Sequence, residues 1–304
     1  MSDIKEVVQK IMEVNFKFDT DVSVLVVTDM STKDLGSAFH QALHELGWET
    51  YIHVMEDRNK SGEEPDAHIA KEMLNHGIVF CLTKHSLTHT VARRHASEQG
   101  ISVITMPGIN EDIFLHGAIN ADYDRVEQET NEIVALLTSH EKVTIESGDG
   151  LTLRIPIGER KGVPSTGVFH KKGDSGNLPS GEAYIAPLEG EAEGEIEING
   201  SIAGIGLVHE PVILKITAGR LVHASGEVGQ KLMDILGEGD GRLLAELGIG
   251  TNHAARVTGN ILEDEKAKNT IHVAFGSNHT FGGVIKTDVH IDCVTKSPGV
   301  IWES

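Results

Sequence analysis

The first half of the chain alternates strand-like apolar runs with amphipathic segments. The run at 22–28 is typical of a strand buried on both faces, and three further apolar strands are predicted at 48–55, 76–83 and 101–107. The segments between them have the spacing of helices, and a long helix is predicted over 122–140. Strands that alternate with helices predict right-handed crossovers and a parallel sheet covered by helices. We therefore expect a parallel-sheet α/β domain over residues 1–142.

From about residue 144 the pattern changes to short alternating strands with frequent glycine, and 147–151 and 217–221 are predicted turns of hairpins. The segment 227–250 predicts an interrupted helix whose end carries Glu246. Alternate glutamates over 189–197 predict the solvent face of a strand. These features predict a mainly antiparallel β (α+β) domain over residues 143–304, which we expect to hold the catalytic site.

Three histidines and a closing aspartate, Asp292, are the candidate ligands within residues 272–292. Residues two apart in a strand point to the same face, so His290 and Asp292 project together as half of a metal site. His272 lies in a second apolar run, and His279 follows on a loop before two glycines. Each histidine alone is more typical of a structural role, but four potential ligands that converge by strand geometry predict a metal site.

Two upstream glutamates are candidates to join this cluster. Glu182 follows a Pro-Ser-Gly turn at the start of a strand, and Glu246 precedes the glycines of Leu-Gly-Ile-Gly. The alternative for each is a solvated surface carboxylate. His85 and His89 are four residues apart on the predicted third helix and form a weaker candidate pair, without the glutamate that a His-Glu-x-x-His motif requires.

Composition narrows the choice of partners. The formal net charge is −20, which argues against nucleic acid or an anionic membrane as a partner. No glycine-rich nucleotide signature follows any early strand, and no stretch has the length of a membrane helix. The two cysteines, Cys81 and Cys293, lie in apolar runs and predict buried thiols in a reducing compartment. We expect a cytoplasmic protein that acts on a small molecule or peptide.

Four segments in the same order resemble the metallo-aminopeptidases of the aminopeptidase T and aminopeptidase S type, over roughly residues 140–292. They are NLPSGEAYIAPLEG, LLAELGIGTN, LEDEKAKNTIHVAFGSN and the final HID. The resemblance implies an N-terminal α/β domain, a homodimer, and two divalent ions (zinc, manganese or cobalt) in the C-terminal domain. It also implies a set of metal ligands, which falls here on Glu182, Glu246, His272, His290 and Asp292.

The chain departs from that family at one ligand position. Seven residues after its first histidine the family has a tyrosine, and this chain has His279. It is also shorter, with a compressed gap between His279 and the closing His-x-Asp. For a hydrolase that removes N-terminal residues from peptides through a metal-activated water, Glu182 and Glu246 would both be ligands. One of them would also be the general base, and Glu182 is the candidate for this role. His279 would then be a further ligand or the donor to the developing oxyanion.

A second resemblance is to the ring-cleaving 2,5-dihydroxypyridine dioxygenases, which also end in His-x-Asp. That resemblance implies one Fe(II) held by His290, Asp292 and either His272 or His279. The matches at Glu182 and Glu246 favour the hydrolase. A third possibility is a metal-binding relative without catalytic activity.

Overall fold

The computed structural model describes residues 2–304, which form two compact units. The first comprises the chain up to Arg125 together with Gly167–Ser180, and the second comprises Val126–Thr166 together with Gly181–Ser304. The predicted boundary near residue 142 lies inside the second unit. Each unit has its own sheets, so the chain has the mixed α/β architecture that the sequence predicts.

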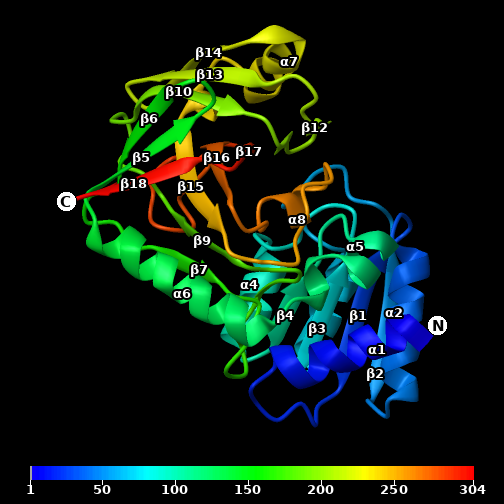
Figure 1. Ribbon diagram of the computed structural model, residues 1–304. Helices are drawn as coiled ribbons and strands as arrows, with labels where there is room; N and C mark the ends of the chain where they lie inside the picture. The colour runs from blue at the N-terminus through cyan, green and yellow to red at the C-terminus, as the bar shows by residue number, and fades with distance from the viewer. Residues whose placement is uncertain (1) are drawn as a thin grey trace. The chain divides into compact units, whose positions relative to one another are not determined.

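A five-stranded parallel sheet forms the centre of the first unit (Figure 1). Its order is β2 (Thr50–Met55), β1 (Val24–Asp29), β3 (Ile78–Leu82), β4 (Ser102–Thr105) and β8 (Gly176–Asn177). All residues of β1, β3 and β4 are buried, which explains their continuous apolar sequences. The four strands predicted in this half of the chain are confirmed.

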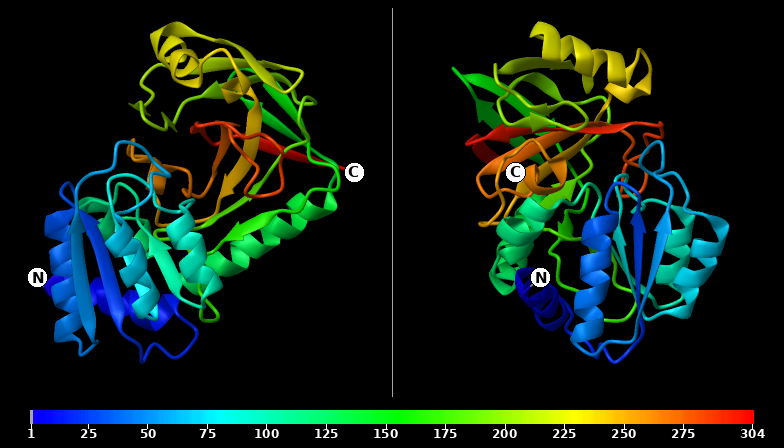
Figure 2. Two further views of the ribbon diagram at one scale, coloured as in Figure 1. Left: turned by 180° about the vertical axis from the view of Figure 1, so that it is seen from behind. Right: turned by 90° about the vertical axis from the view of Figure 1, so that its right-hand side faces the viewer.

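Helices cover both faces of this sheet (Figure 2). They are α1 (Ser2–Lys10), continued by a π-helical turn (Ile11–Asn15), α2 (Lys33–Glu45), α3 (Ala67–Glu72), α4 (Val91–Glu98) and α5 (Glu111–His116). On one face Phe80 of β3 packs against Phe16 and Phe39. On the other, Leu25 and Val79 belong to a buried cluster with residues of α3 and α4. This two-sided burial is the reason for a parallel sheet.

The second unit contains two antiparallel sheets. The first has the order β14 (Arg220–Ala224), β13 (Val212–Thr217), β10 (Glu193–Ile198), β6 (Leu151–Pro156), β5 (Lys142–Ser147) and β18 (Gly299–Glu303). The other has the order β12 (Gly206–Leu207), β11 (Ser201–Ile202), β17 (His290–Lys296), β16 (Thr270–Gly276), β15 (Leu244–Gly250), β9 (Glu182–Ile185) and β7 (Val163–Ser165). Its helices are α6 (Tyr123–Ser139), which begins in the first unit, α7 (Gly226–Leu236) and α8 (Ile261–Asp264).

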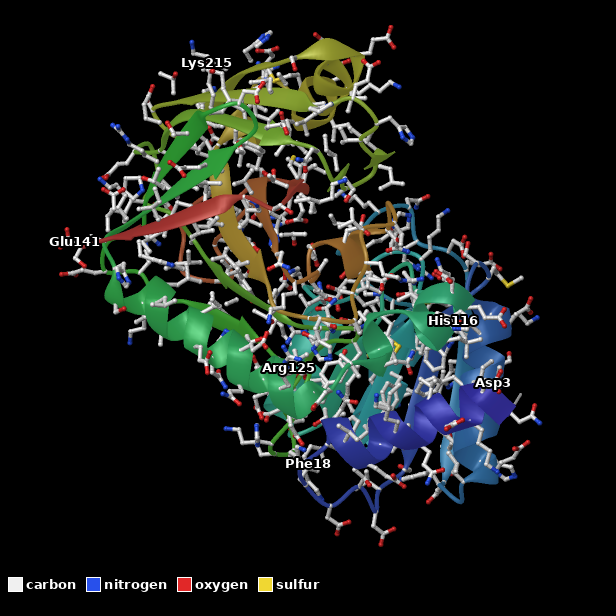
Figure 3. The ribbon with its side chains drawn as sticks, in the orientation of Figure 1. Asp3, Phe18, His116, Arg125, Glu141 and Lys215 are labelled. Carbon is white, nitrogen blue, oxygen red and sulfur yellow. The ribbon has the colours of Figure 1, made fainter. Side chains whose placement is uncertain are left out.

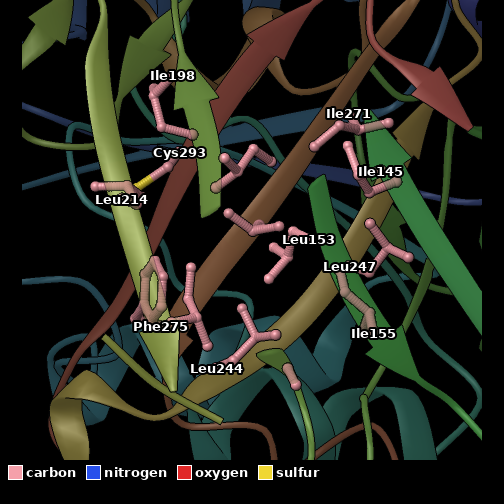
Figure 4. Close-up of a cluster of buried hydrophobic side chains, with 14 of the residues drawn as sticks. Ile145, Leu153, Ile155, Ile198, Leu214, Leu244, Leu247, Ile271, Phe275 and Cys293 are labelled. Carbon is pink, nitrogen blue, oxygen red and sulfur yellow. The ribbon is translucent and has the colours of Figure 1, made fainter. Parts of the chain in front are cut away.

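One apolar core joins the two sheets of the second unit (Figure 4). Leu153 and Leu214 of the six-stranded sheet lie in the same buried cluster as Leu247, Ile271 and Phe275 of the seven-stranded sheet. Two sheets that share an apolar layer each bury one face there. The opposite face of β15, β16 and β17 is therefore available for polar side chains.

The sequence-based assignment of residues 244–250 to a helix is wrong. Helix α7 ends at Leu236, and Gly237 follows with a φ of 67°, a conformation that favours glycine. Residues 244–250 form β15, because Leu247 and Ile249 alternate with smaller or polar residues and enter the core. Glu246 is therefore a strand residue.

The predicted helical pair of His85 and His89 is also wrong. Thr90 is the N-cap of α4, and its side chain accepts a hydrogen bond from the backbone N–H of Arg93. Both histidines precede this cap and lie in the connection after β3. Their separation of four residues therefore does not place them on one helix face.

The two cysteines lie in the core, as their apolar surroundings predict. Cys81 and Cys293 are both free thiols and fully buried, and burial raises the pKa of Cys81 to about 12. Acidic side chains such as Asp3 and Glu141 point away from the ribbon into solvent (Figure 3). Across residues 2–304, the structure contains no helix of the length and apolar character needed to cross a membrane.

Candidate metal centre

Strand register brings the predicted ligands to one face of the seven-stranded sheet. Glu246 of β15 pairs with Ala274 of β16, which pairs in turn with Asp292 of β17. Two residues further along β15, Gly248 pairs with His272 of β16. Residues that pair directly share a face, and residues two apart on one strand share it too.

The same register places the remaining two predicted ligands, Glu182 and His290, on this face. Glu182 of β9 pairs with Gly250 of β15, and His290 of β17 pairs with Gly276 of β16. Glycine or alanine thus lies opposite or beside each functional side chain on this face. The small residues leave space for imidazole and carboxylate groups to meet above the sheet.

Glu246 lies between two imidazoles. Its Oε1 is 3.1 Å from Nε2 of His272, and its Oε2 is 3.4 Å from Nε2 of His290. Nε2 of His290 is also 3.4 Å from Oδ1 of Asp292, and Nε2 of His272 is 3.6 Å from Oε2 of Glu182. Of these side chains only His290 is substantially exposed, at 32%. The arrangement suits a bridging carboxylate.

Gly248 makes room for the His272 ring. A Cβ atom at this position would lie 2.0 Å from Cε1 and 2.1 Å from Nε2 of His272. The ring therefore lies directly on the backbone of β15. This close approach gives the Glu-Leu-Gly-Ile-Gly sequence a physical explanation, since alternate positions supply a ligand and the space beside it.

Two charged residues that sequence reasoning did not single out complete the cluster. Glu265, Glu182 and His272 each offer a ligand atom within 4.8 Å of the others, as do Glu246, His272 and Asp292. The ammonium group of Lys266 lies 3.3 Å from Oε1 of Glu182 and contacts Oε1 of Glu265. Glu265 and Lys266 belong to a charged run in the sequence, a pattern typical of solvated turns.

His279 lies on the loop after β16, where its side chain is exposed. Its Nδ1 is 2.9 Å from Oγ of Ser277. Within residues 2–304, neither group with three close ligand atoms includes His279. Its role as ligand or oxyanion donor stays a prediction.

Glu189 corrects another expectation from the sequence. Instead of lying on a solvent face, it accepts a hydrogen bond of 2.9 Å from the backbone N–H of Val284 and pairs with Arg160. Its Oε1 also accepts from Nδ2 of Asn278, which is fully buried. Glu189 thus holds both ends of the loop that carries His279.

Electrostatics show a cluster of carboxylates that attracts positive charge. Burial disfavours protonated His272, but the hydrogen bond to Glu246 and the nearby carboxylates outweigh it and raise its pKa to about 9. The same competition, dominated on the favourable side by Asp292, raises the pKa of His290 to about 10. Burial opposes ionisation of Asp292, yet His290 lowers its pKa to about 2. Protons on the two imidazoles occupy positions that a metal ion could take.

The donor set fits a divalent metal. Carboxylate oxygens and imidazole nitrogens are ligands for zinc, manganese, cobalt and iron. Oε2 of Glu182 is buried and accepts no hydrogen bond from any residue in 2–304, although Nε2 of His272 lies 3.6 Å away. A cation bound beside it would satisfy this oxygen.

Comparison with protein families supplies the identification. The model of the thermophilic metalloprotease family (M29) matches residues 115–288, more than half of the chain. The chain belongs to this family. It is a metallopeptidase-type hydrolase, and the family implies a divalent metal. The matched range contains Glu182, Glu246 and His272 and ends just before His290 and Asp292.

Two solved structures share its fold over nearly the whole chain. The 2,5-dihydroxypyridine dioxygenase from Pseudomonas putida KT2440 matches with a TM-score of 0.81 at 17% identity, covering 98% of this chain and 93% of that one. Wild-type AmpT from Thermus thermophilus matches with a TM-score of 0.71 at 16% identity, covering 99% of this chain and 95% of that one. Comparison with curated proteins gives no match.

Proposed function

We propose that the protein is a metal-dependent aminopeptidase that removes N-terminal residues from small peptides. The observation that carries the proposal is Glu246, which turns one carboxylate oxygen toward each of two imidazoles on a buried strand face. Membership of a metalloprotease family supports hydrolysis. We propose zinc, manganese or cobalt as the metal, with two ions per chain as the expectation.

The other four proposed ligands form two pairs, one on each side of Glu246. Glu182 and His272 lie on one side, and His290 and Asp292 lie on the other. When bound, the metal supplies a Lewis acid for the scissile carbonyl and a water with a pKa of about 7. Glu182 has one buried oxygen, Oε2, without a hydrogen bond, and we assign this oxygen as a metal ligand.

A peptide with a free amino terminus provides the test. The metal-loaded protein should hydrolyse leucyl- or alanyl-p-nitroanilide but leave the N-acetylated versions intact, because an aminopeptidase must recognise the free amine. Glu246→Gln should lower kcat/KM by about 100-fold or more, since the amide cannot bridge with two anionic oxygens. Equal cleavage of the acetylated substrates, or full activity in Glu246→Gln, contradicts the proposal.

A second candidate function rests on His272, His290 and Asp292. Two histidines and one carboxylate are the ligand set of mononuclear iron oxygenases, and the Pseudomonas putida dioxygenase shares the fold. In this case the protein would bind iron and cleave a hydroxylated pyridine ring with dioxygen. Oxygen uptake in the presence of 2,5-dihydroxypyridine and Fe(II), without p-nitroanilide hydrolysis, would favour this function.

Two finer expectations stay predictions. Homodimeric assembly can be checked by light scattering of the purified protein, and cytoplasmic location by cell fractionation. A metal-binding relative without catalytic activity would take up metal and process neither substrate class.

A further inference from the structure

Lys266 is a buried lysine inside the candidate metal centre. Its side chain is 1% exposed, and its ammonium lies 3.3 Å from Oε1 of Glu182 and contacts Oε1 of Glu265. A desolvated ammonium requires charged partners, and these two carboxylates supply them. Lys266 therefore brings a permanent positive charge to a place where a metal ion is also expected.

The backbone of Lys266 is fixed on both sides. Its N–H donates to the carbonyl of Glu263 at 3.0 Å, and its carbonyl accepts from the N–H of Asn252 at 2.9 Å, just beyond β15. The adjoining Gly250 packs so closely that a Cβ atom would lie 2.1 Å from the carbonyl oxygen of Ala267. These contacts hold the start of the lysine side chain against the strand that carries Glu246.

The preceding turn is held just as firmly. Asp264 accepts hydrogen bonds from the N–H groups of Thr258 at 2.7 Å and Gly259 at 2.8 Å. Glu263 is fully buried and pairs with Arg256 at 3.1 Å. Both carboxylates are used to fasten the turn, so Lys266 and Glu265 are left to face Glu182.

The two oxygens of Glu182 consequently have different surroundings. Oε1 faces the ammonium of Lys266, whereas Oε2 is buried, accepts no hydrogen bond within residues 2–304, and lies 3.6 Å from Nε2 of His272. We infer that Lys266 is a fixed cation of this centre that restricts Glu182 to one metal-binding oxygen. Glu265 is then the partner of Lys266 and not a metal ligand.

This inference depends on the proposed metal site but not on which reaction the site performs. It assigns Lys266 as a positioning residue, since it acts on the metal through Glu182. A positive charge a few ångströms from a divalent ion also repels that ion, even at an effective dielectric constant of about 20. Lys266 therefore weakens metal binding while it orients the ligand.

The test compares two lysines that lie two residues apart. Lys266→Met removes the buried charge and keeps the length of the side chain. Lys268→Met is the matched control, because Lys268 also pairs with a glutamate, Glu129, at 2.7 Å, but is 38% exposed. The probe is Co²⁺ alone, with its Kd measured by chelator competition and its coordination read from the visible absorption spectrum.

We expect Lys266→Met to bind Co²⁺ about tenfold or more tightly than the wild type, because the repulsion is gone. Its visible spectrum should change as the second oxygen of Glu182 joins the coordination sphere. Lys268→Met should match the wild type in both respects. Unchanged or weaker binding by Lys266→Met, with an unchanged spectrum, overturns the inference.

Glu265→Gln tests whether Glu265 is the partner of Lys266 or a metal ligand. It also provides a test of the inference if Lys266→Met does not fold. The amide oxygen can still accept from Lys266, so the wild-type Co²⁺ spectrum should persist. A changed spectrum or loss of Co²⁺ would make Glu265 a ligand and overturn the inference. A wild-type protein that binds no Co²⁺ would refute the metal site itself, and this result is distinguishable from the other two.

Discussion

The two faces of β15, β16 and β17 share one backbone and serve opposite purposes. On one face Leu247, Val273 and Cys293 are fully buried in the core between the sheets. On the other, Glu246 and His272 meet above Gly248, with small residues at the neighbouring positions. The alternation of strand side chains separates stability from chemistry here, so that substitutions on the two faces should have separable effects.

The largest effect on the polar face is expected from Gly248→Ala. A methyl group there would overlap the ring of His272, so that the imidazole must move out of the cluster. We expect metal content and activity to be lost. Gly239→Ala is the control, because a Cβ atom at Gly239 meets nothing within 4 Å. Elemental analysis of both purified variants checks the prediction, and full metal content in Gly248→Ala would contradict it.

Leu247→Ala truncates a side chain on the apolar face of the same strand. Leu247 is fully buried, and truncation of such a residue costs about 2–5 kcal/mol in the free energy of unfolding. Because Leu247 points away from the ligands, the folded variant should bind metal with wild-type affinity. Urea unfolding of the metal-free protein measures the first quantity and chelator competition the second. A large loss of metal affinity in a variant that is still folded would show that the two faces are coupled.

Protonation of the two imidazoles should make metal binding depend on pH. The pKa of His272 is raised to about 9 and that of His290 to about 10, so both are protonated in the metal-free protein at neutral pH. Each metal-bound imidazole must release this proton. We expect about two protons per chain to be released at pH 7.5 and fewer above pH 10, measured by calorimetry in buffers of different ionisation enthalpy.

The same shifts set the stability of the metal-free protein. Because the folded-state pKa values lie above the usual value near 6.5, the stabilisation is complete below about pH 6.5 and is lost as pH rises toward 9–10. Thermal unfolding of the metal-free protein should therefore occur at lower temperature as pH rises through this window. An unfolding temperature that increases over the window would contradict the assigned protonation.

The smallest effect is expected at the loop that follows β16. Glu189→Ala removes the acceptor for Val284 and Asn278, and the loss should be about 1 kcal/mol for each hydrogen bond. Glu191→Ala, an exposed neighbour, is the control. Faster proteolysis at 277–285 in Glu189→Ala, with the rest of the chain unchanged, would confirm the anchor. Equal proteolysis of both variants would contradict it.

The sequence predicts those features of the fold that depend on burial of both faces of a strand. The continuous apolar runs of β1, β3 and β4 predicted a parallel sheet, and the apolar surroundings of Cys81 and Cys293 predicted buried thiols. The one-face spacing of His290 and Asp292 was also visible, because it depends only on the period of a strand.

Features that depend on tertiary packing were not readable. The sequence of residues 244–250 resembles the end of a helix because glycines mask its alternation. The role of these glycines follows from the packing of the His272 ring on Gly248. The charged run containing Glu265 and Lys266 resembles a solvated turn, and only the contact with Glu182 reveals a buried ion pair. Such contacts join residues far apart in the chain, and no local pattern encodes them.

The most direct test of the central claim is the metal content per chain of the purified protein and of Glu246→Gln, measured by elemental mass spectrometry. The bridging position of Glu246 predicts about two zinc, manganese or cobalt ions in the wild type and a marked loss in the variant. A wild type that copurifies with about one iron per chain would instead favour the oxygenase. Equal metal content in the two proteins would contradict the assignment of this strand face as the metal centre.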